Sequence, residues 1–537
     1  MARSFHPYLS RFKGWWAFWS LPRLLLLMSI PIILASCTAL FGSDPPPTRE
    51  GKGSLIAQEN ARKGSASWLI PTNRAASTQI QVYASALSAL PGQTVTFYVS
   101  VQQAGTSYTI DIYRLGWYGG AGARLMQSTK QVGQAQGYYD YSKKELVDCH
   151  SCLVDPKTRL IEARWQPSFK LRIPDNWITG VYLAKLTGAA DKQTFLTFDV
   201  RGNPHSTYVA VTSDTTYAAY NDWGGYSLYH GPDGSDATRA SKVSLDRPAS
   251  VGASVQGLPY EIDAIRWMER QGYDLSYISS VDLNDDPQQL LNHRAYLDLG
   301  HDEYWSEAMR DGVESARNAG VGLAFLGAND GYWQIRFEPD SMDRADRTIV
   351  CYKDLKTDPF YGLDNRHVTV HWRDDLLSRP ENALIGIMWS NFANQPPGFP
   401  WQVNQQVSSP LLAGTGLQPG EAYGCDLVGY EWDRVFHNGA TPPGLRVLSV
   451  SATVAADGTH DFSNTTYYIA QSGAMVFATG SIYWSYALDS LRLLQPAEGC
   501  AHHTSPIPGM QKLLANVMAA LVVHQAPAPT PTATATR

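Results

Sequence analysis

The chain has 537 residues, which at roughly 150 residues per domain is too long for one compact domain. Hydrophobic residues make up 44% and charged residues 17%, with 16 Trp and 29 Tyr, so the bulk of the chain is not disordered. The formal net charge is −6, and because the first 36 residues hold four cations and no acid, a chain without them would carry −10, which argues against nucleic-acid binding.

The amino terminus, residues 1–36, predicts a bacterial lipoprotein signal peptide. Its apolar run from Leu24 to Ala35 is about 12 residues long, shorter than the ~20 residues of a membrane-spanning helix. The run ends in Leu34-Ala35-Ser36-Cys37, which resembles the lipobox, the motif whose cysteine receives the lipid in bacterial lipoproteins. The alternative is an ordinary signal peptide with a chance cysteine. We expect a lipid on Cys37 and an extracytoplasmic protein anchored in the bacterial cell envelope.

A tether and a tail flank the folded part of the chain. Residues 37–75 include Pro45-Pro46-Pro47 and predict a linker, and residues 526–537 predict a disordered Pro/Ala/Thr tail. Export permits disulfides among the five remaining cysteines, whose pairing the sequence leaves open: Cys149, Cys152, Cys351, Cys425 and Cys500. The Cys149-His150-Ser151-Cys152 segment favours a loop disulfide over half a zinc site or a redox pair.

Residues 76–202 predict a β-sandwich. Apolar and polar residues alternate with period two, as in Thr94 to Val99 and Val181 to Leu186, and turn signals such as Pro91-Gly92 separate these runs. A turn at Pro174 to Trp177 that leads into the strand at Gly180 is common in immunoglobulin-like modules. We expect an immunoglobulin-like fold here.

Residues 203–525 predict an α/β domain with β-rich insertions between 335 and 470. Strands and helices alternate, which indicates a parallel sheet with helices on both faces. Ligands in such sheets bind beyond the carboxyl ends of the strands. The expected strands are Tyr208–Thr212, Leu275–Ile278, Ala295–Leu299, Leu323–Leu326 and Ala474–Thr479, and the expected helices are Ile262–Gly272, Glu307–Ala319 and Met510–Val523.

The segment Gly300 to Trp305 follows a buried strand and carries His301 and Glu303. Two residues apart on an extended backbone, their side chains face the same side. An imidazole and a carboxylate suit a metal ion or an acid/base pair, and the alternative is that they cap the following helix. No cysteine, and no serine before Ser306, lies at this turn, and a Gly-x-Ser-x-Gly motif is absent, which argues against a covalent nucleophile.

Two further segments contain polar and aromatic residues. Tyr217 to Tyr226 lies a few residues beyond a predicted strand, and its aromatic side chains suit either a carbohydrate platform or the lid of a core. Val428 to Asp433 places Glu431 and Asp433 on either side of a tryptophan, which is a weak signal by itself.

Together these motifs resemble one family, the large subunit of N,N-dimethylformamidase. The resemblance covers about Gln79 to Val523. It rests on four segments in order: Tyr113 to Gly120, Tyr220 to Gly225, Gly300 to Trp305 and Gly327 to Asp330. It implies a β-sandwich followed by an α/β domain like that of class I glutamine amidotransferases. It also implies a soluble enzyme with a small partner subunit, in which two tyrosinates and a glutamate hold one iron that hydrolyses a small formamide.

Carried onto this sequence, the resemblance makes Glu303 the carboxylate ligand and Tyr220 the first tyrosinate. Tyr182 is the candidate for the second, on spacing rather than on a motif. His301 would position water or substrate, and Glu431 would accept a proton. The implied cofactor is mononuclear ferric iron, for which hard anionic oxygens are suitable ligands.

Two functions remain open at this point. The first is a surface-anchored metal-dependent amidohydrolase that cleaves a C–N bond of a small amide. The second is a lipoprotein that binds carbohydrate or peptide without turnover, since a shared fold does not fix function. Expected partners are the small amide, the membrane through Cys37, and a second copy of the chain or a small subunit, with no nucleic acid.

Overall fold

The computed structural model describes residues 53–249, 257–394, 398–491, 493 and 506–524. The predicted signal peptide, Cys37, the first part of the tether (residues 37–52) and the tail at 526–537 lie outside these ranges. Residues 53–75, which the sequence also predicted as tether, are folded instead: they contain the helix Leu55–Asn60 and bury Ile56 and Trp68. Within the described residues, no helix has the length and apolar character needed to cross a bilayer.

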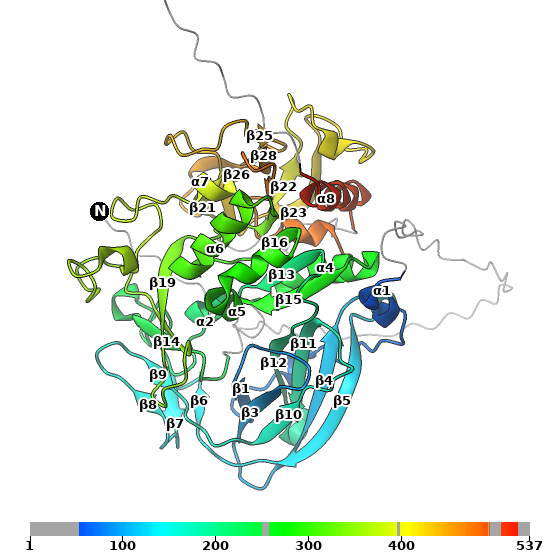
Figure 1. Ribbon diagram of the computed structural model, residues 1–537. Helices are drawn as coiled ribbons and strands as arrows, with labels where there is room; N and C mark the ends of the chain where they lie inside the picture. The colour runs from blue at the N-terminus through cyan, green and yellow to red at the C-terminus, as the bar shows by residue number, and fades with distance from the viewer. Residues whose placement is uncertain (1–52, 250–256, 395–397, 492, 494–505, 525–537) are drawn as a thin grey trace, which may run out of the picture.

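The amino-terminal part is a sandwich of two sheets, drawn in blue and cyan at the bottom of Figure 1. One sheet has the order β1-β3-β10 and the other β2-β12-β11-β4-β5. Alternate residues of both sheets, such as Phe97, Ile112 and Phe198, meet in a shared core, as period-two patterning requires. The strands are β1 (Ile80–Ala84), β2 (Ser88–Ala89), β3 (Thr94–Val101), β4 (Ser107–Leu115), β5 (Ala123–Val132), β10 (Phe169–Arg172), β11 (Gly180–Thr187) and β12 (Gln193–Val200).

A seven-stranded sheet of order β15-β13-β16-β18-β29-β28-β25 forms the centre of the molecule. Its first five strands run parallel; at one edge β28 pairs antiparallel with β29, and β25 pairs antiparallel with β28. The predicted strands are confirmed to within a residue. The bounds are β13 (Tyr208–Thr212), β15 (Leu275–Ser279), β16 (Ala295–Gly300), β18 (Gly322–Gly327), β25 (Arg446–Val447), β28 (Thr466–Ile469) and β29 (Met475–Ala478).

Helices cover both faces of this sheet (Figure 1). The helices α4 and α8 pack with residues such as Ala210 and Leu297 on one face, whereas α5 and α6 pack with Val209 and Val211 on the other. Gly272, in the left-handed conformation, ends α4 as predicted. The helices are α1 (Leu55–Asn60), α2 (Asp214–Tyr220), α4 (Leu258–Gln271), α5 (Ser280–Asp285), α6 (Glu307–Asn318), α7 (Asn382–Ile385) and α8 (Pro508–Leu521).

Smaller sheets surround these two units. A four-stranded sheet, β14-β20-β19-β17, lies beside the central sheet, and the predicted β-rich insertions supply three antiparallel two-stranded sheets. The bounds are β6 (Tyr138–Asp140), β7 (Glu145–Val147), β8 (Leu153–Val154), β9 (Ile161–Glu162), β14 (Lys242–Ser244), β17 (Tyr304–Ser306), β19 (Trp333–Glu338), β20 (Thr348–Val350), β21 (Met388–Phe392), β22 (Phe399–Gln402), β23 (Ala422–Val428), β24 (Glu431–Arg434), β26 (Ser451–Val454) and β27 (His460–Ser463).

A buried ion pair joins the sandwich to the α/β unit. Arg114 of β4 and Glu269 of α4 are 2.8 Å apart, and both side chains are fully buried. The guanidinium also donates to the Thr179 carbonyl at 2.7 and 3.0 Å, and the carboxylate accepts from Tyr277 at 3.2 Å. Because both charges lie out of water, each depends on the other for compensation.

The cysteines follow the prediction in part. Cys149 and Cys152 form a disulfide, which confirms the loop-disulfide interpretation of that segment. Cys425 is also disulfide-bonded, Cys351 is buried with a free thiol, and Cys500 lies outside the described residues.

Candidate functional site

The central sheet changes winding direction between β13 and β16. The strand β13 pairs with β15 on one side and with β16 on the other, so the crossovers that leave β13 and β16 diverge from each other. Ligands of doubly wound sheets bind at such a point, beyond the carboxyl ends of the strands. Tyr220 ends the helix that follows β13, and Glu303 lies three residues beyond β16. The topology therefore brings these two predicted site residues together.

Glu303 is the centre of the cluster, with its side chain 3% exposed. Its Oε2 accepts a hydrogen bond from the Tyr220 hydroxyl at 2.9 Å, and the Tyr229 hydroxyl lies 2.5 Å from Oε1 and 2.6 Å from Oε2. The Trp333 indole donates to Oε1 at 3.1 Å. The rings of Tyr220 and Tyr229 stack with centroids 4.3 Å apart. Burial and the charge of Glu303 raise the pKa of both phenols well above the ordinary value.

The backbone of this turn is fixed from both sides. Gly300 has a φ of +77°, which lets the chain leave β16 sharply. The Glu303 amide donates to the Thr216 hydroxyl of α2 at 2.8 Å, and the Glu303 carbonyl accepts from the amides of Tyr332 and Trp333 at 2.9 Å each. Glu303 is thus held by the segments that follow both neighbouring strands.

His301 lies against the same cluster and is 2% exposed. Its Nδ1 is 3.0 Å from the Ala328 carbonyl, so Nδ1 carries the proton and Nε2 is left as an acceptor. Nε2 lies 3.4 Å from the Tyr220 hydroxyl and 3.6 Å from Glu303 Oε2. Burial lowers the pKa of the imidazole, so His301 is neutral at pH 7.

Lys353, which the sequence analysis did not single out, supplies a cation to this cluster. Its Nζ lies 3.5 Å from the centroid of the Tyr229 ring and 2.6 Å from the Tyr304 hydroxyl. Burial lowers the pKa of the ammonium to about 8, with the charge of Glu303 opposing the shift. An ammonium over the face of Tyr229 would favour negative charge on that ring.

Glu431 approaches from β24. Its Oε2 accepts a hydrogen bond from the side-chain amide of Asn329 at 2.7 Å. Burial, and to a lesser extent the charge of Glu303, raises the pKa of the Glu431 carboxyl. Asn329 follows β18, and its backbone N–H donates a hydrogen bond to the Asp433 carboxylate at 2.9 Å. The segments containing Glu431 and Asn329, both noted in the sequence, therefore meet at this edge of the sheet.

Tyr182 is not part of this cluster. It lies in the middle of β11 on the face that points into the sandwich core, stacked on Trp177 with ring centroids 4.9 Å apart. Its hydroxyl donates to the Ile178 carbonyl at 2.8 Å. The second tyrosine at Glu303 is instead Tyr229, nine residues after Tyr220, which no motif in the sequence had indicated.

The loop that carries Tyr220 and Tyr229 is held by the sandwich. Trp223, fully buried, packs between Tyr139 and Trp165, and its indole donates to Gln81 of β1 at 2.8 Å. Gly224 has a φ of +85° and lies so close to Ile161 that a Cβ would be 2.5 Å from the isoleucine methyl. The aromatic segment predicted as a carbohydrate platform or the lid of a core is thus largely buried, and it fixes the loop against the sandwich.

The helix-cap alternative for His301 and Glu303 differs from what is observed. The cap of α6 is Ser306, whose hydroxyl accepts from the Met309 amide at 3.2 Å, and the short strand β17 separates Glu303 from the helix. Among the described residues, no three or more His, Cys, Asp and Glu side chains form a group suited to a metal ion, so tyrosines would have to complete any set around Glu303.

A family model and two relatives of similar sequence point to the same family. A family model described as N,N-dimethylformamidase beta subunit-like, C-terminal, matches residues 109–502. The N,N-dimethylformamidase beta subunits of Paracoccus aminophilus and of an Alcaligenes species are each 24% identical to this chain over 399 residues, covering 60% of this chain and 52% of theirs. The chain thus spans about half the length of the curated relatives it matches.

A solved structure of a Paenibacillus cycloisomaltooligosaccharide glucanotransferase with cycloisomaltoheptaose is 12% identical to the chain, covering 52% of this chain and 35% of its own, with a TM-score of 0.14. A likeness that low supports no argument about this chain. The family model, in contrast, spans most of the sandwich and the whole site around Glu303. The chain therefore belongs to the N,N-dimethylformamidase beta subunit-like family.

Proposed function

We propose that this protein is a metal-dependent amidohydrolase that cleaves the C–N bond of a small amide at one ferric ion held by Tyr220, Tyr229 and Glu303. The observation that carries the proposal is the contact of both tyrosine hydroxyls with one buried carboxylate, 2.5 to 2.9 Å away, at the switch point of the sheet. The relatives' name, N,N-dimethylformamidase beta subunit, supports the choice of an amide as substrate.

The donor set suits such an ion. Two phenols and a carboxylate offer three hard oxygen ligands, all anionic once the phenols lose their protons. Trivalent iron prefers such ligands to the nitrogen and sulfur ligands typical of zinc. Both phenol oxygens lie within hydrogen-bond distance of the Glu303 carboxylate, so a cation bound to that carboxylate would lie close to both. Lys353 over the Tyr229 ring would help to hold negative charge on that phenolate.

Iron at this position would polarise the amide carbonyl and lower the pKa of a water molecule. The protein's own groups divide the remaining work. His301 Nε2, left as an acceptor by the bond from Nδ1 to Ala328, can hold a water proton or orient water beside Tyr220. Glu431, held by Asn329, can take up a proton and return it to the leaving amine.

We further propose that the chain acts at the bacterial cell surface, tethered by a lipid on Cys37, and that it assembles with a small subunit or with a second copy of itself. The lipobox-like segment at residues 34–37 and the relatives' description as beta subunits support these two proposals. An immunoglobulin-like sandwich and an amidotransferase-like α/β domain remain our assignment for the two units.

The direct test is elemental analysis and a visible spectrum of the purified protein, followed by a screen of small formamides and acetamides. About one iron per chain with a tyrosinate-to-iron absorption band, and release of amine from an amide, would support the proposal. Colourless protein with zinc would contradict the ligand set. Protein that binds no added iron but retains carbohydrates or peptides would replace the proposal with the binding-protein alternative.

Metal uptake should depend on pH in a defined direction. The raised pKa values of Tyr220 and Tyr229 mean that both phenols are protonated without metal, so binding an ion as phenolates releases protons. Iron affinity should therefore increase as the pH rises from about 6 to 8, by about tenfold per unit for each proton released. Competition titrations with a chelator at several pH values measure this, and affinity that is flat across that range would rule out phenolate ligands.

Two phenylalanine variants distinguish the tyrosine seen at the site from the one expected on spacing. Tyr229→Phe should lower iron affinity at least about tenfold and shift the visible band, because it removes one of three ligand oxygens. Tyr182→Phe should leave both unchanged, since its hydroxyl bonds only a backbone carbonyl in the sandwich core. The reverse pattern would show that Tyr182, not Tyr229, holds the metal.

A further inference from the structure

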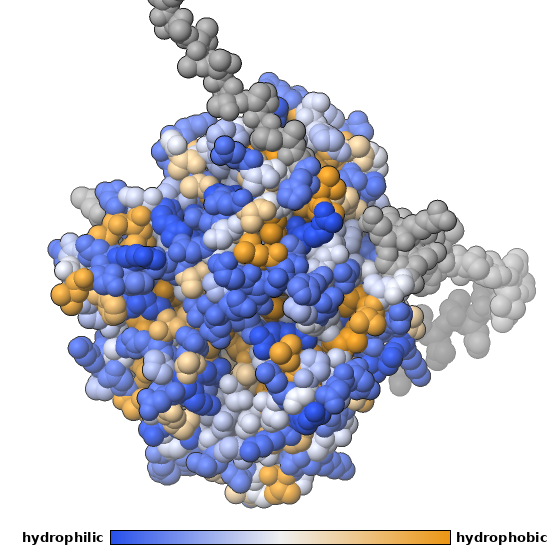
Figure 2. Space-filling model, viewed as in Figure 1, coloured by the Kyte–Doolittle hydropathy of each residue, from blue (hydrophilic) through white to orange (hydrophobic). Residues whose placement is uncertain are grey.

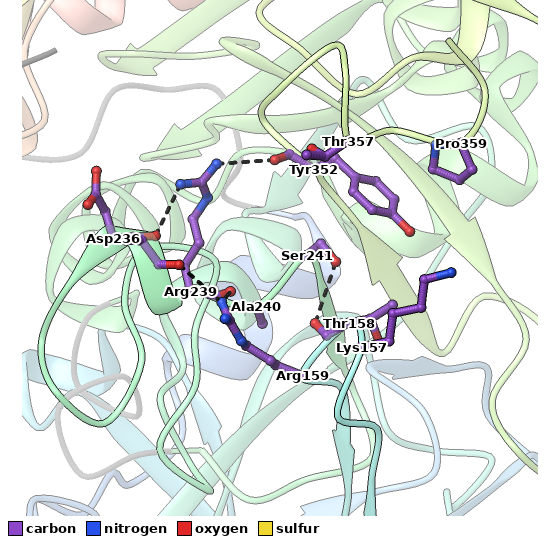
Figure 3. Close-up of a pocket in the computed structure, with 11 residues that line it drawn as sticks. Lys157, Thr158, Arg159, Asp236, Arg239, Ala240, Ser241, Tyr352, Thr357 and Pro359 are labelled. Atoms are coloured by element: carbon purple, nitrogen blue, oxygen red, sulfur yellow. Dashed lines mark hydrogen bonds between the residues drawn. The ribbon is translucent and has the colours of Figure 1, made fainter.

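A cavity of about 360 Å³ lies at the end of the four-stranded sheet where β14 begins and β20 ends (Figure 3). Its walls come from three separate segments: the turn between β8 and β9, the stretch that leads into β14, and the loop after β20. That volume falls within the range of pockets that hold small molecules. The charged and aromatic lining residues are Lys157, Arg159, Asp236, Arg239 and Tyr352.

The cavity is cationic although the chain is acidic overall. Three of its lining residues are cations and one is an acid, against a formal net charge of −6 for the chain. In the described part of the chain, no carboxylate lies within ion-pair distance of Lys157, Arg159 or Arg239. An accumulation of unpaired cations in a concave surface attracts anions more strongly than the same charges on a flat one.

Backbone carbonyls hold both guanidinium groups in place. Arg159 donates from Nη1 to the carbonyls of Arg239 at 2.6 Å and Ala237 at 3.3 Å, and Arg239 donates to those of Asp236 at 3.1 Å and Tyr352 at 3.2 Å (Figure 3). A guanidinium has five N–H groups, so each retains donors beyond these bonds. Neutral carbonyls fix the direction of each arginine without cancelling its charge.

The turn that presents Lys157 and Arg159 is also rigid. The Asp155 carboxylate accepts from the amides of Lys157 at 3.1 Å and Thr158 at 3.2 Å, and the Thr158 carbonyl accepts from the Ser241 amide at 3.0 Å. The acid nearest in sequence is thus used to close the turn. Two fixed arginines next to an exposed lysine form an arrangement that suits a planar or tetrahedral oxyanion.

We propose that this cavity is a second binding site, for a small molecule with a phosphate or carboxylate group, with Arg159 and Arg239 gripping the oxyanion and Lys157 closing over it. The Tyr352 ring among the lining residues offers a flat surface for the rest of the ligand. The site is distinct from Glu303, which is not among its lining residues. The two are neighbours: the lining residue Ala240 belongs to the apolar cluster against which Tyr220 and Tyr229 pack, and Lys353 follows Tyr352.

The apolar surface gives weaker evidence for a binding site. On the face drawn in Figure 2, apolar residues form small groups among polar ones rather than one broad apolar area. Isolated apolar groups of that kind are normal on soluble proteins. The cationic cavity is the feature whose chemistry selects a ligand.

Isothermal titration of the purified protein with inorganic phosphate, and separately with succinate, tests the proposal. We expect saturable one-to-one binding below about 10 mM for at least one of them, weakened by added salt. The double variant Lys157→Gln/Arg159→Gln should lower the affinity at least about tenfold, because it removes two charged donors. The matched control is Lys170→Gln, which changes an exposed lysine of β10 outside the cavity.

Two further variants remove the remaining ambiguities. Phosphate also binds ferric iron, so the titration is repeated on Glu303→Gln, where the affinity should be unchanged. Lys157 is exposed and its side chain bonds nothing in the described residues, so Lys157→Gln alone keeps the fold and should still weaken binding measurably. No saturation with either anion, equal affinity in the double variant, or loss of binding in Glu303→Gln would each overturn the proposal.

Discussion

Glu303→Gln should reduce bound iron from about one per chain to less than about a tenth, and should lower amide hydrolysis at least about a thousandfold. The amide keeps the shape of the carboxylate but loses its charge, and its nitrogen faces side chains that already donate: Tyr220, Tyr229 and Trp333. Metal content measured by mass spectrometry and amine release from the best amide report the two effects.

The matched control is Glu261→Gln. Glu261 is also buried and also accepts from a tyrosine, Tyr217, and burial raises the pKa of its carboxyl to about 8. Because that carboxyl is already mostly neutral at pH 7, its amide should change iron content little. Iron that remains in Glu303→Gln at the level of this control would remove Glu303 from the metal site.

Arg114→Met should lower the free energy of unfolding by about 3–5 kcal/mol, the largest stability effect we expect from one substitution. The change leaves the Glu269 carboxylate fully buried without its cation and frees the Thr179 carbonyl. Since the pair joins β4 to α4, the loss should appear as a lower urea midpoint for the sandwich and the α/β unit together, followed by tryptophan fluorescence.

Two further variants serve as controls for Arg114→Met. Arg172→Met removes an ion pair with Asp175 whose side chains are 60% and 75% exposed, and should change the midpoint little. Arg114→Met/Glu269→Leu removes both buried charges and should recover part of the stability. If Arg114→Met and Arg172→Met shift the midpoint equally, the buried pair does not hold the two units together.

The sequence predicted the central sheet well because its signals are local. Short apolar runs such as Tyr208–Thr212 match β13, and Gly272 ends α4 where the helix needs a left-handed residue. The helix α2 was missed because its seven residues, of the types Asp, Thr, Tyr and Ala, form no apolar stripe. The strand β17 was missed because only its pairing with β19 makes it a strand.

The cluster around Glu303 was predictable for residues that follow a predicted strand and not for those that depend on the packing of a loop. Glu303 and His301 lie just beyond β16, and Tyr220, at the end of α2, was indicated by the family resemblance. Tyr229 lies at the cluster only because the loop before it folds back, which no spacing rule contains. Tyr182 lies away from the cluster for a different reason: β11 is buried on both faces, so period-two alternation cannot tell which face a residue takes.

The burial of Trp223 among residues of the sandwich limits how the two halves of such proteins can be recombined. The loop with both site tyrosines lies in the α/β unit by sequence, yet its central tryptophan is seated among aromatic residues of the amino-terminal half. Cutting the chain near residue 203 would expose that tryptophan and release both phenols from Glu303. The two halves can therefore be exchanged only together. A chimera with a different amino-terminal half would need the same aromatic contacts around Trp223 to keep both tyrosines at Glu303.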